Sequence, residues 1–109
     1  MNELIKNFEA LLTQGQDNAL LRFGLGNAYF KQKDFAQAAQ HFAKAIEFNP
    51  KYSAAWKNYG KALSENQQIQ EAIEVYTQGI TVAEEQGDKQ AAKEMMVFLK
   101  RLQKMVNNR

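Results

Sequence analysis

Apolar residues recur at intervals of three and four along the whole chain, with polar residues between them. This spacing is typical of amphipathic helices that each bury one stripe. Gly15, Pro50 and Gly87 interrupt the pattern where turns are expected. The sequence therefore predicts an all-α fold of about six antiparallel helices, at Asn2–Thr13, Asn18–Gln32, Phe35–Phe48, Ala54–Asn66, Ile69–Gln86 and Lys89–Val106.

Several of these boundaries have a local cause in the sequence. Asp34 precedes the third helix and can accept a hydrogen bond from its first turn, with Gln37 placed to form a capping box. Pro50 disfavours helical backbone at Asn49 and so ends that helix. Asp88 is placed to cap the last helix.

A second regularity is a repeat of 34 residues. Gly26 recurs as Gly60, and Phe42 recurs as the related aromatic Tyr76. A fixed period of this length indicates stacked supersecondary units that share one continuous core.

The period and its anchors resemble the tetratricopeptide repeat (TPR), whose pattern is W-x2-L-G-x2-Y, then A-x3-F, then P. The matching positions are Leu25, Gly26, Tyr29, Ala38, Phe42 and Pro50 in the first copy, and Trp56, Gly60, Ala72 and Tyr76 in the second. Arg22 stands where the pattern has Trp, while Leu63 and Glu84 replace Tyr and Pro in the second copy. The resemblance spans residues 19–84.

The resemblance implies an α-solenoid with a right-handed superhelical stack. We expect one domain over residues 1–109, divided into an N-terminal flanking helix (1–16), repeat 1 (19–52), repeat 2 (53–86) and a C-terminal capping helix (88–107). In this family Gly26 would face Ala38, and Gly60 would face Ala72, where the two helices of a repeat cross. Trp56 and Tyr76 would fill the core, and the outer face of the terminal helix would be charged.

Composition fits an ordinary globular domain, and charge changes the picture only at the C-terminus. Fourteen basic residues against twelve acidic ones give a net charge of +2, which makes no case for nucleic acid or membrane. Residues 88–109, however, carry six basic side chains against two acidic ones: Lys89, Lys93, Lys100, Arg101, Lys104 and Arg109. A solvated face explains this excess, and contact with an anion or nucleic acid is the alternative.

Catalytic, metal-binding and cofactor-binding motifs are absent from the sequence. His41 is the single histidine and has no cysteine, elbow-type serine or glycine-rich phosphate loop to work with. It falls on a side that faces outward in the TPR family, so a surface position is expected. The N-terminus lacks the features of a signal peptide, and no segment is apolar for long enough to span a membrane, which makes the cytoplasm the expected compartment.

In TPR proteins the first helix of each repeat lines a concave groove that holds a peptide or a partner helix. Helical spacing groups the candidate groove residues on one side of these two helices: Phe23, Asn27, Phe30, Lys31, Lys57, Asn58, Lys61 and Ser64. Asparagine amides suit a peptide backbone, and lysines suit a carboxylate. The expected ligand is an extended acidic peptide, although exposed lysines are also typical of a solvated helix face.

Some chaperone-adaptor TPR domains grip a C-terminal Asp with two asparagines and three basic residues. By that resemblance Asn27 and Asn58 match the asparagines, whereas the basic positions fall on Phe23, Asp88 and Ala92 and are lost.

The sequence thus predicts a non-enzymatic adaptor or scaffold that binds another protein. Self-association of an incomplete repeat stack is the second hypothesis.

Overall fold

The computed structural model describes residues 2–108, and all the regular structure in that range is helical. The six helices are α1 (Glu3–Thr13), α2 (Ala19–Lys31), α3 (Phe35–Phe48), α4 (Ser53–Glu65), α5 (Ile69–Glu85) and α6 (Lys89–Asn107). Every predicted boundary lies within one residue of the observed one. The predicted all-α architecture is confirmed, while Arg109 lies outside the described residues.

Side-chain caps begin four of the helices. The side chain of Asp34 accepts a hydrogen bond from the backbone N–H of Gln37, and that of Asp88 accepts one from Ala91. Asn2 and Asn18 cap α1 and α2 in the same way. These bonds satisfy backbone donors that have no partner inside the helix, which is why helices begin at these residues.

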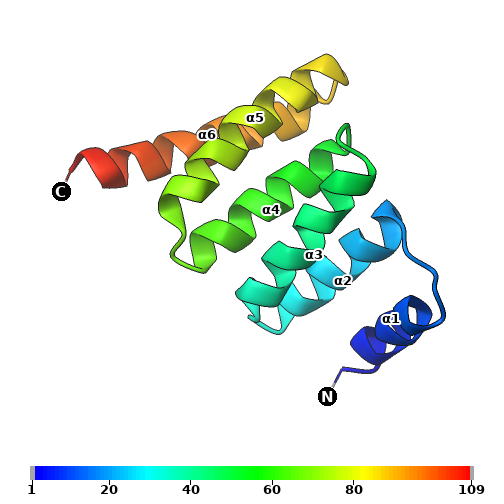
Figure 1. Ribbon diagram of the computed structural model, residues 1–109. Coiled ribbons are helices and arrows are strands. Elements are labelled where there is room, and N and C mark those ends of the chain that lie inside the picture. The colour runs from blue at the N-terminus through cyan, green and yellow to red at the C-terminus, as the bar shows by residue number, and fades with distance from the viewer. Residues whose placement is uncertain (1, 109) are drawn as a thin grey trace.

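The helices form two rows (Figure 1). Successive helices pack against each other from α1 to α6, and α4 also contacts both α2 and α6. No comparable contact joins α3 to α5 within the described residues. Because α2, α4 and α6 touch while α3 and α5 do not, the stack curves toward α2, α4 and α6. We call these three helices the inner row, and α3 and α5 the outer row.

The glycines of the repeat pattern make room for aromatic rings. A Cβ atom added at Gly26 would lie 2.5 Å from Cε1 of Phe42, and one added at Gly60 would overlap the ring of Tyr76. The atoms nearest to these glycines thus belong to the rings of Phe42 and Tyr76, each four residues after Ala38 or Ala72. Phe42 and Tyr76 are almost completely buried, so each glycine allows a large ring to enter the core.

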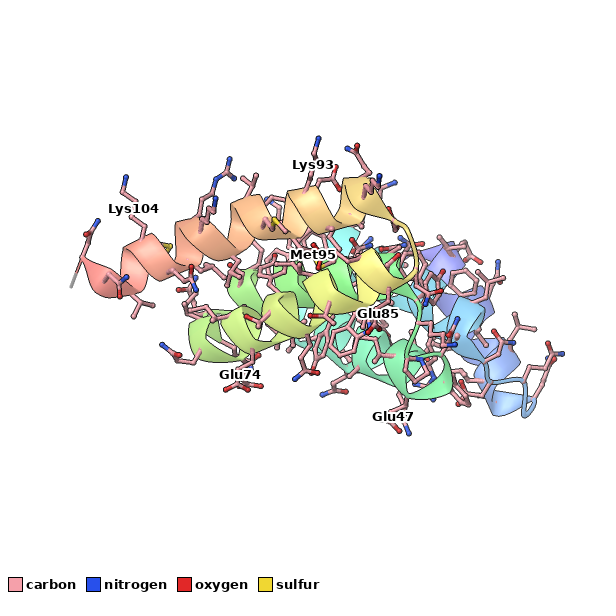
Figure 2. The ribbon with its side chains drawn as sticks, turned by 90° about the horizontal axis from the view of Figure 1, so that it is seen from above. Glu47, Glu74, Glu85, Lys93, Met95 and Lys104 are labelled. Carbon is pink, nitrogen blue, oxygen red and sulfur yellow. The ribbon has the colours of Figure 1, made fainter. Side chains whose placement is uncertain are left out.

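The last helix is attached to the stack by Met95, which is fully buried. A Cβ atom at Gly79 of α5 would lie 2.7 Å from Sδ of Met95, so a glycine outside the repeat pattern admits this side chain. Figure 2 shows Met95 pointing between α5 and α6, whereas Lys93 and Lys104 project away from the stack. None of the helices described is long and apolar enough to cross a membrane.

Candidate functional site

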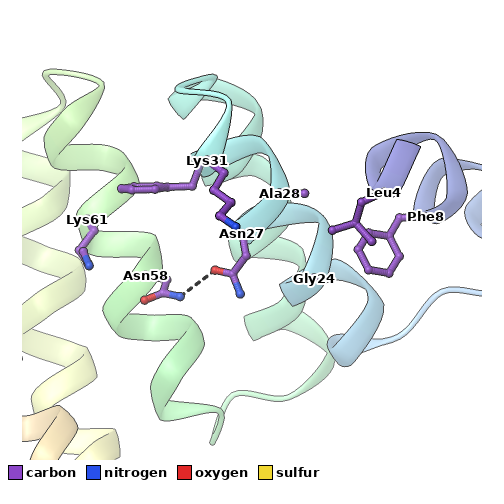
Figure 3. Close-up of a pocket in the computed structure, with 9 residues that line it drawn as sticks. Leu4, Phe8, Gly24, Asn27, Ala28, Lys31, Asn58 and Lys61 are labelled. Atoms are coloured by element: carbon purple, nitrogen blue, oxygen red, sulfur yellow. Dashed lines mark hydrogen bonds between the residues drawn. The ribbon is translucent and has the colours of Figure 1, made fainter. Parts of the chain in front are cut away.

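A hollow of about 470 Å³ opens between α1, α2 and α4 (Figure 3). At its centre the amide nitrogen of Asn58 donates a hydrogen bond of 2.9 Å to the amide oxygen of Asn27. Five of the eight predicted groove residues line it: Asn27, Phe30, Lys31, Asn58 and Lys61. Leu4 and Phe8 of α1 form its other wall.

A second hollow of about 460 Å³ lies between α4, α5 and α6. It contains Ser64, another of the predicted residues. Phe30 and Lys61 line both hollows, so the two lie next to each other along the inner row, and we call them together the inner groove. The second hollow is lined by Phe30, Lys61, Ser64, Glu65, Tyr76, Phe98, Arg101, Leu102 and Met105.

Two predicted residues, Phe23 and Lys57, are directed elsewhere. The ring of Phe23 packs against Tyr52 and Phe42, with centroid separations of 4.8 and 5.8 Å. Nζ of Lys57 lies 2.7 Å from Oε1 of Glu94 on α6. The hydrogen bond from Lys57 is the main reason why the pKa of Glu94 lies below its usual range. Neither residue lines the inner groove.

Three cations line the inner groove. Nζ of Lys61 lies between two rings, 5.9 Å from the centroid of Phe30 and 5.8 Å from that of Phe98, and the guanidinium of Arg101 lies 5.9 Å from Phe98. The ion pairs formed among residues 2–108 include neither Lys61, Arg101 nor Lys31. Aromatic faces attract a cation without neutralising its charge, so all three remain able to bind an anion.

The two rows of helices carry opposite charge. The inner-row helices contain nine basic and two acidic residues, a net charge of +7, whereas the outer row contains one basic and five acidic residues, a net charge of −4. In Figure 2, Lys93 and Lys104 of α6 project on the side opposite to Glu47 and Glu74 of the outer row. The overall charge of +2 conceals this separation. Of the nine basic residues, Lys31, Lys61 and Arg101 line the inner groove.

The sequence predicts a cap for α6, with anion or nucleic-acid contact through its basic residues as the alternative, and it does not predict that this helix lines the groove. The positions of Phe98, Arg101 and Met105 follow helical spacing, so they share one face. Phe98 lies on the repeat period, 34 positions after Ser64 and 68 after Phe30, whereas Arg101 and Met105 have no counterpart among the predicted groove residues.

His41 is buried, contrary to the surface position expected from the family pattern. Its ring stacks on Tyr29 at 5.4 Å, and its Nδ1 lies 3.1 Å from a guanidinium nitrogen of Arg22. Arg22 also donates two hydrogen bonds of 2.8 Å to Asp17. A guanidinium can only donate, so Nδ1 of His41 accepts and its ring is neutral. His41 belongs to the packing of α2 on α3 and lies away from the inner groove.

The polar groups that line the inner groove within residues 2–108 are two amides, three cations, one carboxylate and the hydroxyls of Ser64 and Tyr76, and the rest of the lining is aromatic or aliphatic. No group of three or more His, Cys, Asp or Glu side chains in residues 2–108 is arranged to hold a metal ion. The arrangement can hold a polar chain through amides and anionic side chains through Lys31, Lys61 and Arg101.

Comparison with known proteins agrees with this architecture. One tetratricopeptide-repeat family model matches residues 19–52, and a second matches residues 41–74. The TPR repeat-containing protein PA0015 of Pseudomonas aeruginosa is 46% identical over 99 residues, which cover 91% of this chain and 94% of that protein. This chain belongs to the tetratricopeptide-repeat family. TPR domains are protein-interaction modules, so the family gives the kind of function but no partner.

Solved TPR structures share the fold of this one. The solution structure of the Bordetella parapertussis protein BPP2914 aligns with a TM-score of 0.83 at 40% identity and covers 96% of this TPR chain and 91% of that one. The first TPR domain of Spaghetti (RPAP3), solved with the HSP90 peptide SRMEEVD, aligns with a TM-score of 0.70 at 22% identity, over 95% of this chain and 90% of that chain. At that identity the second likeness supports the fold alone.

Proposed function

We propose that this TPR protein is a non-enzymatic interaction module that binds an extended, acidic segment of another protein along the inner groove. The observation that carries the proposal is the presence of Lys31, Lys61 and Arg101 in the groove, none of them engaged in the ion pairs of residues 2–108. An acidic peptide would neutralise cations that this chain leaves unmatched.

The asparagine pair fits the backbone of such a peptide. One N–H of Asn58 is used by Asn27, which leaves the amide nitrogen of Asn27 and the amide oxygen of Asn58 for a ligand. Both side chains line the first hollow, next to Lys31 and Lys61. A peptide can thus receive main-chain hydrogen bonds and side-chain ion pairs at neighbouring points of the groove.

The geometry favours a mode of binding different from the clamp of chaperone adaptors. Asp88, at one of the clamp's basic positions, caps α6 and accepts a hydrogen bond of 2.6 Å from Ser53. Ala92, at another, is buried. The HSP90 peptide bound by the RPAP3 domain is acidic, and we propose that the present groove takes acidic sequences through Lys31, Lys61 and Arg101 instead.

Affinity capture from an extract of the native cells tests this proposal. Three immobilised proteins are compared: the wild type, a groove variant with Asn58→Ala and Lys61→Ala, and a control with Gln40→Ala and Lys44→Ala on exposed positions of α3. Both variants must retain the wild-type circular dichroism spectrum. We expect a partner that is held by the wild type and the control and is lost by the groove variant.

A short groove of this kind is expected to give affinities in the micromolar range, or about 8 kcal/mol of binding free energy. Capture is therefore performed at a protein concentration above that range. A partner held equally by all three proteins would show that binding uses another surface.

A further inference from the structure

The second hollow has an apolar floor and a charged rim. Tyr76 and Leu102 form the floor and are 2% and 5% exposed, and the half-buried ring of Phe98 adjoins them. Met105, at the mouth of the hollow, is 54% exposed. A hollow lined in this way removes a large apolar side chain from water, which provides binding free energy in proportion to the area covered.

Lys61 lies between the two hollows and lines both of them. Its ammonium group is held between the rings of Phe30 and Phe98, with Arg101 on the same Phe98 ring. Among residues 2–108, Glu65 is the one acidic residue that lines either hollow, so the cations of the inner groove outnumber its carboxylates by three to one. An anionic group bound to Lys61 would lie beside the mouth of the apolar hollow.

We infer that the inner groove recognises two neighbouring side chains of its peptide. An acidic side chain binds Lys61 and Arg101, and a large apolar side chain next to it enters the second hollow over Tyr76 and Leu102. This inference rests on the proposed function and adds to it the class of sequence that the groove selects. The charge fixes the position of the peptide along the groove, while the apolar side chain supplies most of the area that is buried.

Selection from a library of random 12-residue peptides displayed on phage tests the inference. The targets are the wild type, Lys61→Gln and Ser64→Phe. Ser64 is half-buried and lines only the second hollow, so a phenyl ring there fills it and leaves the first hollow unchanged. The matched controls are Ser64→Ala and Lys104→Gln. The side chain of Lys104 projects from α6 away from the other helices (Figure 2). Circular dichroism verifies that each variant is folded.

We expect the wild type and both controls to enrich peptides that pair Asp or Glu with Leu, Ile, Phe or Trp. Lys61→Gln should lose the preference for the acid, and Ser64→Phe should lose the preference for the apolar residue. A synthetic copy of the selected peptide, measured by fluorescence anisotropy, should bind each of these variants at least about tenfold more weakly than the wild type. A copy with Ala at the apolar position should bind the wild type and Ser64→Phe equally.

The possible failures are distinguishable. Acidic peptides without an apolar requirement would overturn the two-point inference and leave the proposed function standing. If the selected peptides need an apolar residue but Ser64→Phe selects the same residue, the second hollow is not its binding site. The two-point inference would then be wrong, and the proposed function would still stand. If the wild type enriches no peptide relative to the Asn58→Ala, Lys61→Ala variant, both the inference and the proposed function are wrong.

Discussion

At the scale of single residues, the two repeats differ at one pair of equivalent positions, which is polar in the first repeat and apolar in the second. Arg22 and His41 of the first repeat correspond, 34 positions later, to Trp56 and Val75 of the second. Trp56 and Val75 pack against the main core cluster. Arg22 and His41 form a hydrogen-bonded pair, so the first repeat has a polar pair at positions where the second repeat has two apolar side chains. A buried polar pair is stabilising only while both partners remain satisfied.

This pair makes stability depend on pH. Burial, followed by the charge of Arg22, holds the pKa of His41 below its ordinary value of 6.5. On acidification the unfolded chain therefore takes up this proton first, and stability is lost as the pH falls through 6.5 toward the pKa of the folded state. The loss cannot exceed that of one proton, about 1.4 kcal/mol per pH unit. We expect urea unfolding at pH 7.5 and 5.0 to show this decline for the wild type and a smaller one for His41→Gln.

Asp17 changes its protonation at a lower pH than His41 and does not affect the comparison between pH 7.5 and 5.0. Its hydrogen bonds from Arg22 hold its pKa below the ordinary value of 3.8, so its contribution is lost only as the pH falls below that value. An equal decline between pH 7.5 and 5.0 in the wild type and in His41→Gln would show that His41 is not the group responsible.

Gly60 is predicted to tolerate no side chain. Replacement by Ala improves helix propensity by about 1 kcal/mol, but the new Cβ atom overlaps the ring of Tyr76, which is almost completely buried. Overpacking of this kind costs about 1–3 kcal/mol, so we expect Gly60→Ala to lower the free energy of unfolding. Chemical denaturation measures it, with Ser64→Ala on the same helix as control. A Gly60→Ala variant as stable as the wild type would contradict the account of this crossing.

Two features of single residues could not be predicted from the sequence: the burial of His41 and the identity of the atoms that approach the repeat glycines. The family pattern predicts a surface position for His41. The residues next to His41 in the sequence do not indicate that it forms a hydrogen bond with Arg22, which stands where the family pattern has a tryptophan. The glycines were recognised as sites of close approach, but whether the approaching atoms belong to an alanine or to a ring depends on how two helices cross. Both features depend on packing between residues far apart in the sequence.

At the scale of elements, the turn inside each repeat contains a strained residue. Lys33 and Gln67, again 34 positions apart, have positive φ angles of 63° and 65°. This region is costly for residues with a Cβ atom, and glycine adopts it freely. The turns connect α2 to α3 and α4 to α5 and so fix how each helix pair is aligned.

Replacement of Gln67 by Gly is expected to stabilise the protein. Relief of the left-handed conformation outweighs the added freedom of the unfolded chain, with a net gain of about 0.5–1 kcal/mol. Gln70→Gly, at an exposed position inside α5, is the control and should lose about 1 kcal/mol. Thermal unfolding of the two variants provides the measurement. A lower melting temperature for Gln67→Gly would show that the Gln67 side chain contributes more than its backbone strain costs.

The helices were predictable to within one residue because their causes are local: apolar spacing, capping side chains and Pro50. The packing of α6 was not, because it depends on Met95 entering the space that Gly79 provides on another helix. The residues on α2 and α4 that were predicted for the groove include most of its lining on those helices, whereas Phe98 and Met105 were not predicted and Arg101 was predicted only as a candidate for anion contact.

At the scale of the whole molecule, curvature and charge act together. Contact within the inner row gives the stack a concave side, and nine of the basic residues belong to the helices of that row. Under the proposed function, Lys31, Lys61 and Arg101 would attract an acidic chain, and the concave shape would increase the area that the chain can contact. The outer row, with five acidic residues, would oppose binding of such a chain to the convex side.

Binding along the concave side can be observed directly in a ¹⁵N–¹H correlation spectrum of the protein, titrated with a peptide selected by the wild type. We expect the shifted signals to belong to the inner groove, including the side-chain amides of Asn27 and Asn58 and the backbone amides of Lys31, Lys61 and Arg101. Signals of Lys44 and Glu47 on α3 should stay in place. Shifts concentrated on α3 and α5, with the asparagine amides unmoved, would contradict the claim that the concave side is the binding surface.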